Sequence, residues 1–259
     1  MNQTVLITGA SSGIGFELAK LFASNQYNLV LIARRQDRLL EFAAEYSAKY
    51  PIKITVISKD LALPTAPDEI YQELKQKAIT IDILVNNAGT QIYGEFQNID
   101  LQAALSLLQV NIIAVTHLTR LLINDMITRG TGKIVNLGST GSFAPGPLNA
   151  IYCASKAYVL SFSESLSKDL EGTGVTVTAI CPGATATEFA AKAEILNTRI
   201  FATMVMKPDK VARIGYRALQ SGRRIVVTGL YNKLLVFSIR FTPRWLILSI
   251  SKFLMRKKA

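Results

Sequence analysis

A tyrosine and a lysine four residues apart, Tyr152 and Lys156, follow a serine, Ser139, that lies thirteen residues before the tyrosine. If this segment is helical, the tyrosine and the lysine share one face, one turn apart. A neighbouring ammonium favours the phenolate, so we expect the pKa of Tyr152 to fall from its usual value of about 10. Such a phenol can protonate a carbonyl or deprotonate an alcohol, while the Ser139 hydroxyl holds the reacting oxygen. Alone, the pair is more typical of a solvated helix surface.

A glycine-rich turn near the start of the chain gives the pair its significance. An apolar run ends in Thr8-Gly-Ala-Ser-Ser-Gly-Ile-Gly15, and a helical pattern follows at once. The glycines permit a tight turn, close approach of the backbone to a pyrophosphate and close packing of helix on strand, and the N–H groups at the helix start favour phosphates. This order of strand, turn and helix predicts a dinucleotide site. The predicted cofactor contacts are Gly9, Ser11, Ser12, Gly13, Ile14 and Gly15.

The end of the second apolar run indicates which dinucleotide is bound. An NAD-binding unit usually has an acid about 20 residues beyond the glycines, whereas a basic residue accommodates the extra phosphate of NADP. Arg34 lies 19 residues after Gly15, Arg35 follows it, and no Asp or Glu occurs between Asn28 and Arg35. Two solvated arginines at the start of a helix are the alternative. We favour NADP(H).

Composition restricts the class of protein. The 259 residues are 49% hydrophobic and 18% charged, which is typical of a globular chain. Two cysteines are too few for a disulfide framework, and the single histidine, His117, excludes a multi-histidine metal site or a histidine-based triad. No cluster of Asp, Glu or Cys has metal-ligand spacing, so we expect no metal. The N-terminal residues run directly into an apolar strand pattern without a basic leader, which favours a cytoplasmic protein.

Short apolar runs alternate with longer amphipathic ones, which indicates strands alternating with helices and a parallel sheet. Most apolar runs are rich in Val, Ile and Leu without alternation, as expected of strands covered on both faces. The expected strands are Thr4–Thr8, Leu29–Ala33, Ile52–Ser58, Ile83–Asn86, Lys133–Leu137, Val175–Cys181 and Ile225–Thr228. The expected helices are Gly13–Ser24, Asp37–Lys49, Pro67–Lys77, Leu101–Thr128, Ile151–Leu170 and Pro208–Ser221.

These elements predict one doubly wound, Rossmann-type α/β domain over residues 1–230, with a seven-stranded parallel sheet and helices on both faces. Residues 231–259 depart from the pattern. They contain seven basic and no acidic residues, a large share of the net charge of +11. An excess confined to one terminus indicates a local surface effect, and we expect no nucleic-acid partner.

The C-terminal residues 231–259 form an expected helical tail. Pro243 should divide it into two short helices, and Arg240 and Arg244 interrupt the apolar residues, so no uncharged run approaches the roughly 18 residues that span a bilayer. Apolar residues with basic flanks and Trp245 fit a helix at an anionic lipid surface. A helix packed over a substrate pocket or against a second subunit is an equal alternative.

With these residues assembled, the chain resembles the short-chain dehydrogenase/reductase family over nearly its whole length. Each matching element is a modest signal, whereas the set in the family's order is specific. After the glycine turn these elements are Asp60-Leu61, Asn86-Asn-Ala-Gly89, Asn111, Ser139, Tyr152-x-x-x-Lys156, and Pro182-Gly183 with Thr187.

The resemblance implies roles in binding the cofactor. It implies that Asp60, with Leu61 beside it, meets the adenine edge. It further implies that Asn87, Ala88 and Gly89 line the adenosine while stabilising the central sheet. The nicotinamide would lie against Pro182, Gly183 and Thr187.

The resemblance also implies the catalytic roles. A hydride would pass to a carbonyl carbon while Tyr152 protonates the oxygen that Ser139 holds. Lys156 would lower the tyrosine pKa and bind the nicotinamide ribose, and Asn111 would hold a water that replenishes the proton. An asparagine inside an apolar helix can instead simply bond the backbone.

We therefore expect an NADP(H)-dependent oxidoreductase that interconverts a carbonyl and an alcohol. Apolar residues after Thr187, including Phe189, Ile195, Leu196, Ile200 and Phe201, and two in the loop after Ser139, Phe143 and Leu148, favour a lipophilic ketone or aldehyde. The alternatives are a 3-oxoacyl-carrier reductase of fatty-acid synthesis and a nucleotide-sensing binding protein without turnover. The resemblance implies a homodimer or homotetramer, and the tail suggests a peripheral contact at the inner membrane surface.

Overall fold

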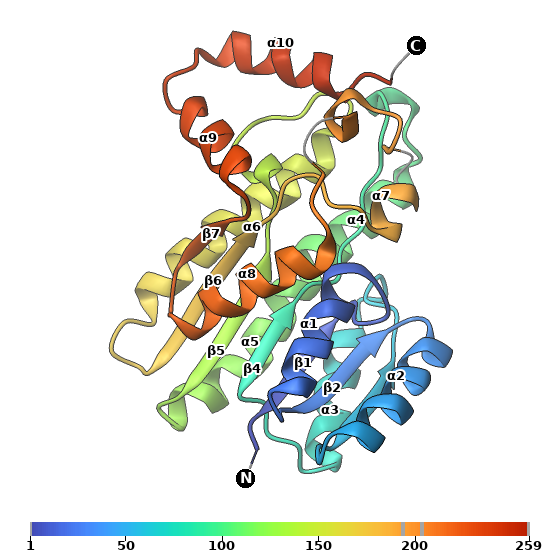
Figure 1. Ribbon diagram of the computed structural model, residues 1–259, viewed down its shortest axis with the longest axis vertical. Coiled ribbons are helices and arrows are strands. Elements are labelled where there is room, and N and C mark those ends of the chain that lie inside the picture. Colours follow the sequence, from blue (N-terminus) through green and yellow to red (C-terminus); the bar gives the residue numbers. More distant parts are fainter. Residues whose placement is uncertain (1, 193–194, 203–204, 258–259) are drawn as a thin grey trace.

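The apolar runs rich in Val, Ile and Leu form one parallel sheet, because helices cover both of its faces and leave no solvated side to alternate with. The computed structural model describes residues 2–192, 195–202 and 205–257; Lys258, the last basic residue of the predicted tail, lies outside it. The strand order is β3-β2-β1-β4-β5-β6-β7 (Figure 1). The strands are β1 (Thr4–Thr8), β2 (Asn28–Ala33), β3 (Ile54–Ser58), β4 (Ile83–Asn86), β5 (Gly132–Leu137), β6 (Val175–Cys181) and β7 (Ile225–Val227).

Alternate side chains of the strands enter two separate cores. Val5 and Ile7 of β1 pack with residues of α1, α2 and α8 on one face. Leu6 points to the other face, where α3 and α5 cover the sheet. These helices are α1 (Gly13–Ser24), α2 (Gln36–Lys49), α3 (Ala66–Gln76), α5 (Ala114–Thr128) and α8 (Pro208–Gln220). The predicted seven-stranded, doubly wound sheet with helices on both faces is confirmed, and the helix and strand bounds differ from those expected by only a few residues.

The predicted single helix Leu101–Thr128 is the main departure. It is divided into α4 (Leu101–Leu108), a π-helical turn η2 (Gln109–Ile113) and α5. The wide turn lies around the buried Asn111, and such turns are common at functional sites. By length and composition this stretch is apolar enough to cross a bilayer, but its buried residues pack on the sheet, as in the core helix of many soluble proteins.

A buried polar network fixes α6 (Ala150–Asp169) to the sheet. The Asn86 side-chain amide in β4 donates to Asn136 Oδ1 in β5 at 2.9 Å and to Thr119 Oγ1 in α5 at 3.1 Å. Asn136 in turn donates to Ser163 Oγ in α6 at 2.9 Å. Because all four side chains are buried, each depends on the others for its hydrogen bonds. The network therefore sets the height of α6 above the sheet.

The tail forms two helices that break at Pro243, as predicted: α9 (Leu230–Ile239) and α10 (Arg244–Met255). They lie beyond the carboxyl ends of the strands (red in Figure 1). Tyr93 Oη donates to the Met255 carbonyl at 2.8 Å, and the Arg199 amide donates to the Arg256 carbonyl at 3.1 Å. The tail is therefore packed over the segment that follows β6, which agrees with one of the two alternatives weighed for it.

Replacing Asn136 by Ala tests the network. The change removes the acceptor of Asn86 and the donor to Ser163 inside the core, so the free energy of unfolding should fall by about 1–3 kcal/mol. Urea denaturation measures it, with the exposed Asn98→Ala, expected within about 0.5 kcal/mol of the wild type, as control. Equal losses in the two variants would show that the network contributes nothing beyond an ordinary surface position.

Candidate active site

A cavity of about 480 Å³ opens at the carboxyl ends of the strands. It lies where the strand order reverses between β1 and β4, the usual ligand position in doubly wound sheets. Every residue predicted for the site lines this cavity except Gly15 and Asn111. The lining residues among those predicted are Gly9, Ser11, Ser12, Gly13, Ile14, Arg34, Arg35, Asp60, Leu61, Asn87, Ala88, Gly89, Ser139, Tyr152, Lys156, Pro182, Gly183 and Thr187.

Gly15 does not line the cavity and has a packing role, while its predicted contact with the cofactor stays a prediction. A Cβ added to Gly15 would lie 2.3 Å from Asn87 Nδ2 and 2.5 Å from the Gly9 carbonyl oxygen. Only glycine lets α1 approach the first strand this closely. The spacing of the glycines alone could not separate this role from a contact with the phosphates.

Asn111 is fully buried, and its side chain joins two walls of the cavity instead of facing it. Its Oδ1 accepts from the Thr90 amide at 2.9 Å, and its Nδ2 donates to the Thr90 carbonyl at 2.9 Å and to Ser155 Oγ at 3.0 Å. Thr90 follows β4 and Ser155 lies in α6. Asn111 therefore holds the loop after β4 against the helix that bears Tyr152.

The catalytic trio predicted from the sequence is brought together. Ser139 begins the short 3₁₀ turn η3 (Thr140–Ser142) after β5, and its hydroxyl accepts from the Gly141 amide at 3.0 Å. Tyr152 and Ser139 share a hydrogen bond through their side chains. Lys156 lies one turn further along α6, with Nζ 5.8 Å from the centre of the Tyr152 ring and donating to the Leu137 carbonyl at 2.7 Å. The predicted shared helix face is confirmed.

The expected lowering of the Tyr152 pKa is wrong for this structure. Burial raises the pKa of the Tyr152 phenol above its ordinary value, and the hydrogen bond from Ser139 opposes this shift only in part. Burial also lowers the pKa of Lys156 from 10.5 to about 8. Both shifts have the same cause, since a buried site disfavours any charged form. The helical spacing of the pair could not reveal how deeply it is buried.

The glycine turn is tied to the end of β4 and leaves donors for a ligand. Asn87 Nδ2 donates to the Thr8 carbonyl at 2.9 Å, and the Asn87 and Ala88 amides both donate to Thr8 Oγ1 at 3.0 Å. Gly9 has a positive φ of 68°, and an added Cβ would lie 2.9 Å from Ala88 Cα. The Ser12 side chain does not cap α1, so N–H groups of the first turn stay available for phosphate oxygens. The turn fits a dinucleotide.

The two arginines after β2 lie differently. Arg34 has an exposed side chain, 3.6 Å from the Asp60 carboxylate. Arg35 is half-buried, and its Nε and Nη2 donate to Ser11 Oγ at 3.3 and 3.1 Å. Both arginines line the cavity with Ser11. The predicted alternative, two solvated side chains, holds for Arg34 more than for Arg35.

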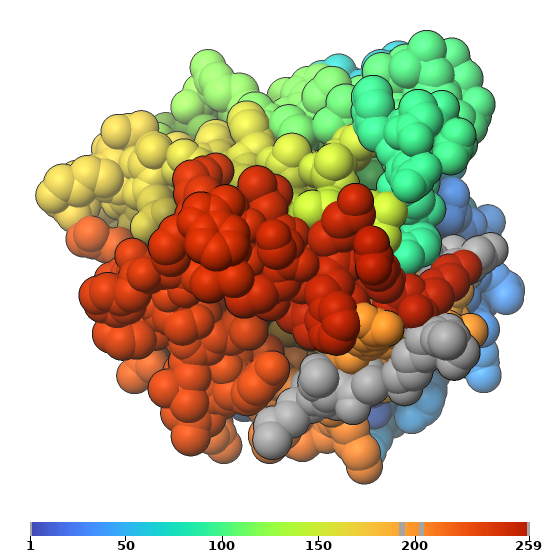
Figure 2. Space-filling view, turned by 90° about the horizontal axis from the view of Figure 1, so that it is seen from above, coloured from blue at the N-terminus to red at the C-terminus, as the bar shows by residue number. Residues whose placement is uncertain are grey.

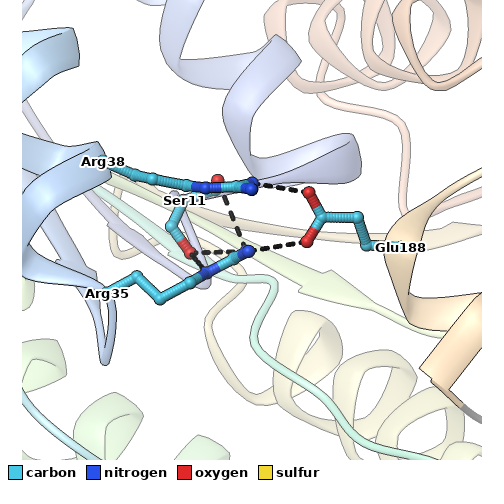
Figure 3. Close-up of polar contacts among 4 residues, drawn as sticks. All are labelled: Ser11, Arg35, Arg38 and Glu188. Atoms are coloured by element: carbon cyan, nitrogen blue, oxygen red, sulfur yellow. Dashed lines mark hydrogen bonds and ion pairs between the residues drawn. The ribbon is translucent and has the colours of Figure 1, made fainter.

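Two residues that the sequence analysis did not assign complete this region. Arg35 Nη1 donates to Glu188 Oε2 at 2.6 Å, and Arg38 Nη1 donates to Glu188 Oε1 at 2.5 Å (Figure 3). Glu188 begins α7 (Glu188–Lys192), about 150 positions further along the chain. Glu188 directly follows the predicted Thr187, but nothing in the sequence pairs it with Arg38.

The opposite end of the cavity is apolar. Of the apolar residues expected after β6, Phe189, Ile195, Ile200 and Phe201 line it, whereas Leu196 is exposed. The ring centroids of Phe189 and Tyr152 are 6.0 Å apart. Neither Phe143 nor Leu148 lines the cavity: Phe143 packs beside β6, and Leu148 packs against the cluster of Ala190, Ile195 and Met255. Met255 of α10, which the sequence analysis did not predict, completes the wall.

Known proteins match this chain along most of its length. The family described as short chain dehydrogenase matches residues 3–195. Sulfoacetaldehyde reductase 2 of Chromohalobacter salexigens is 38% identical over 191 residues, which cover 73% of this chain and 75% of that protein. Ketoacyl reductase HetN of Nostoc sp. is 35% identical over 181 residues, which cover 70% of this chain but only 63% of that protein.

Solved structures show the same arrangement. A short-chain dehydrogenase from Sphingobium yanoikuyae, solved in complex with NADPH, superposes with a TM-score of 0.84 and is 33% identical, and the match covers 92% of each chain. The likeness therefore extends over most of the chain.

The lowered pKa of Lys156 predicts a pH dependence of stability. Between about pH 8 and 10.5 the unfolded chain binds more protons at this site than the folded chain, so the contribution of Lys156 to stability rises with pH there. Relative to Lys156→Met, the wild type should gain about 1–2 kcal/mol of unfolding free energy from about pH 7.5 to about pH 9.5. Urea denaturation of both proteins at each pH measures this gain. A difference that does not change with pH would contradict the buried ammonium.

Proposed function

This chain belongs to the short-chain dehydrogenase family, and on that premise we propose that it is an NADP(H)-dependent oxidoreductase that interconverts a carbonyl and an alcohol. One observation carries the proposal. Tyr152, hydrogen-bonded to Ser139, lines the same cavity as the glycine turn whose donors fit a dinucleotide. A proton donor and a hydride donor in one cavity are what reduction of a carbonyl requires.

In this proposal the bound dinucleotide supplies the hydride, and the chain supplies the rest. Ser139 and Tyr152 bond the substrate oxygen and fix its place. Because burial raises its pKa, Tyr152 is protonated at neutral pH and ready to donate to that oxygen. The phenolate left behind is stabilised by Lys156, whose ammonium is close to the ring in a poorly solvated site. In the reverse direction Tyr152 accepts the proton of the alcohol.

A small gap above Gly89 supports the proposed part of Asn111. A methyl group added to Gly89 would lie 3.4 Å from Asn111 Oδ1 and 3.5 Å from Lys156 Nζ. A point within reach of both polar atoms suits a water that returns protons through Lys156. We therefore propose that Asn111 positions Thr90 and Ser155 and also holds this water.

The preference for NADP(H) rests on the end of β2. Arg34 and Arg35 line the cavity there, and a basic residue at this place accommodates a 2′-phosphate. The solved relative from Sphingobium yanoikuyae, which contains NADPH, adds support. We further propose that Asp60 and Leu61 contact the adenine and that Pro182, Gly183 and Thr187 contact the nicotinamide.

We propose a lipophilic ketone or aldehyde as the substrate. The wall beyond Tyr152 consists of Phe189, Ile195, Ile200, Phe201 and Met255, which offer apolar contact to a substrate chain. The similarity to a ketoacyl reductase favours a 3-oxoacyl thioester as the second candidate. A catalytically idle nucleotide sensor is the third, and the complete Ser139, Tyr152 and Lys156 set is evidence against it.

Residues 1–230 are proposed as the cofactor-binding and catalytic domain of a cytoplasmic homo-oligomer, and residues 231–259 as its basic extension. We propose that the outer face of this extension contacts an anionic membrane surface. Phe241 is 74% and Trp245 68% exposed, and Leu234 and Phe237 are exposed beside them. Figure 2 shows α9 and α10 crossing this side of the molecule. Exposed apolar groups among basic residues, with no acid in the extension, match anionic lipid.

Tyr152→Phe tests the chemistry. It deletes only the phenolic hydroxyl, so turnover of NADPH with a panel of ketones should fall by roughly 10²–10⁴-fold. NADPH binding, measured by fluorescence titration, should stay nearly unchanged. Comparable turnover in the variant would refute Tyr152 as the acid, and binding without turnover in the wild type across the panel would favour the sensor.

The double variant Phe241→Ser/Trp245→Ser tests the membrane contact. Sedimentation with vesicles of phosphatidylglycerol and phosphatidylcholine in equal parts should recover the wild type and lose most of the variant. The matched control is Leu40→Ser/Leu63→Ser, which removes two exposed apolar residues far from the tail and should bind like the wild type. Equal recovery of all three proteins on the anionic vesicles would contradict this contact. Recovery of the wild type on pure phosphatidylcholine as high as on the anionic vesicles would show that anionic lipid is not what it binds.

A further inference from the structure

Glu188 occupies an oxyanion site made by other parts of the chain. Its two carboxylate oxygens each accept from a different arginine, Arg35 and Arg38, and Arg35 also bonds Ser11 (Figure 3). The arginines hold the pKa of Glu188 below its usual range, so the carboxylate is charged at neutral pH. Two guanidinium groups that converge on one anion are also what binds a phosphate monoester.

This oxyanion site coincides with the place assigned to the cofactor's extra phosphate. Ser11, Arg35 and Glu188 all line the cavity beside Gly13 and Asp60, at the end where the adenosine is proposed to lie. A phosphate cannot take both of the Arg35 donors while Glu188 holds one of them at 2.6 Å. The chain's own carboxylate and a 2′-phosphate are therefore competitors for Arg35.

Glu188 also lies at the start of the helix that carries Phe189 of the apolar wall. It is the first residue of α7, and the next residue, Phe189, lies beside Tyr152 with ring centroids 6.0 Å apart. The Glu188 side chain thus ties α7 to Arg38 of α2. Ala190 of α7 packs with Ile195 and Met255 in the apolar wall.

We propose that Glu188 is a latch that imitates the 2′-phosphate of NADP(H): it holds α7 closed on Arg35 and Arg38, and the cofactor phosphate displaces it. The latch rests on the proposed use of NADP(H). Its consequence is a coupling between two sites, since binding the phosphate frees α7 and with it one wall of the substrate end. Coupling is reciprocal, so the closed latch must weaken binding of 2′-phosphorylated nucleotides and leave other nucleotides unaffected.

A simple brace is the competing explanation. Exposed ion pairs typically contribute little to stability, and a Glu188 that only braces α7 would not distinguish one nucleotide from another. Glu171 provides a matched comparison, because it also accepts from an arginine and a lysine, Arg224 and Lys168, each at 2.6 Å. Its side chain is about as exposed as that of Glu188, 45% against 41%, and it does not line the cavity.

Binding of two nucleotide fragments to Glu188→Gln tests the latch without any turnover. The probes are 2′,5′-ADP and 5′-AMP, which differ in the phosphate at issue, and isothermal titration calorimetry gives both dissociation constants. The variant should bind 2′,5′-ADP roughly three- to tenfold more tightly than the wild type and 5′-AMP equally well. Glu188→Ala should behave alike, whereas Glu171→Gln should match the wild type for both fragments.

The outcomes separate the latch from the assignment of the cofactor. Arg35→Ala should lose the preference for 2′,5′-ADP; that loss, together with no gain in Glu188→Gln, would support NADP(H) and overturn the latch. A selective loss of 2′,5′-ADP affinity in Glu188→Gln would also overturn the latch, because Glu188 would then be orienting the arginines for the phosphate. Equal binding of both fragments by every protein would overturn the latch and the NADP(H) assignment together.

Discussion

Desolvation of Tyr152 and Lys156 in one cavity is the constraint on which the proposed chemistry depends. Burial raises the pKa of the phenol and lowers that of the ammonium, so each group alone resists its charged form. A proton transfer from Tyr152 to a substrate oxygen changes this balance, because it creates an anion beside an existing cation. In a site with little water, that pair attracts more strongly than it would in solvent. The cavity thus opposes isolated charges and favours the charge pair that the proposed reaction would produce.

The proposed chemistry requires that Ser139, Tyr152 and Lys156 keep their relative positions, and the buried hydrogen bonds of α6 hold the helix that carries two of them. Ser163 ties the helix to β5 through Asn136, and Ser155 ties it to the loop after β4 through Asn111. Lys156 itself is bonded to the last residue of β5. These contacts lie on one face of α6 and fix both its height and its rotation. A buried polar group that loses its partner is costly, so each contact resists displacement of the helix.

Features that follow a local sequence pattern could be predicted. Features that depend on contacts between residues far apart in the sequence, or on how deeply a side chain is buried, could not. Runs of Val, Ile and Leu specified the strands, and helical spacing placed Tyr152 and Lys156 on one face. The pairing of Arg38 with Glu188 joins residues 150 positions apart and leaves no local pattern. Met255 enters the cavity only because α10 folds back over it. The direction of the Tyr152 pKa shift depended on burial, for which the charge of a neighbouring lysine was a poor guide.

The two ends of the cavity are held by different forces, and this difference decides which end can adapt. Around Ser139 and Tyr152, buried hydrogen bonds fix the geometry that any carbonyl would need. Around Phe189 and Met255, the wall is held by the partly exposed ion pairs of Glu188 and by α10, whose end is hydrogen-bonded to Tyr93 and whose other face is turned to solvent. Partly exposed ion pairs contribute little to stability, so the part of the wall that depends on them is the less rigid one. Because one helix carries both Met255 and the exposed apolar face, a partner that held that face would also fix the wall proposed to contact the substrate.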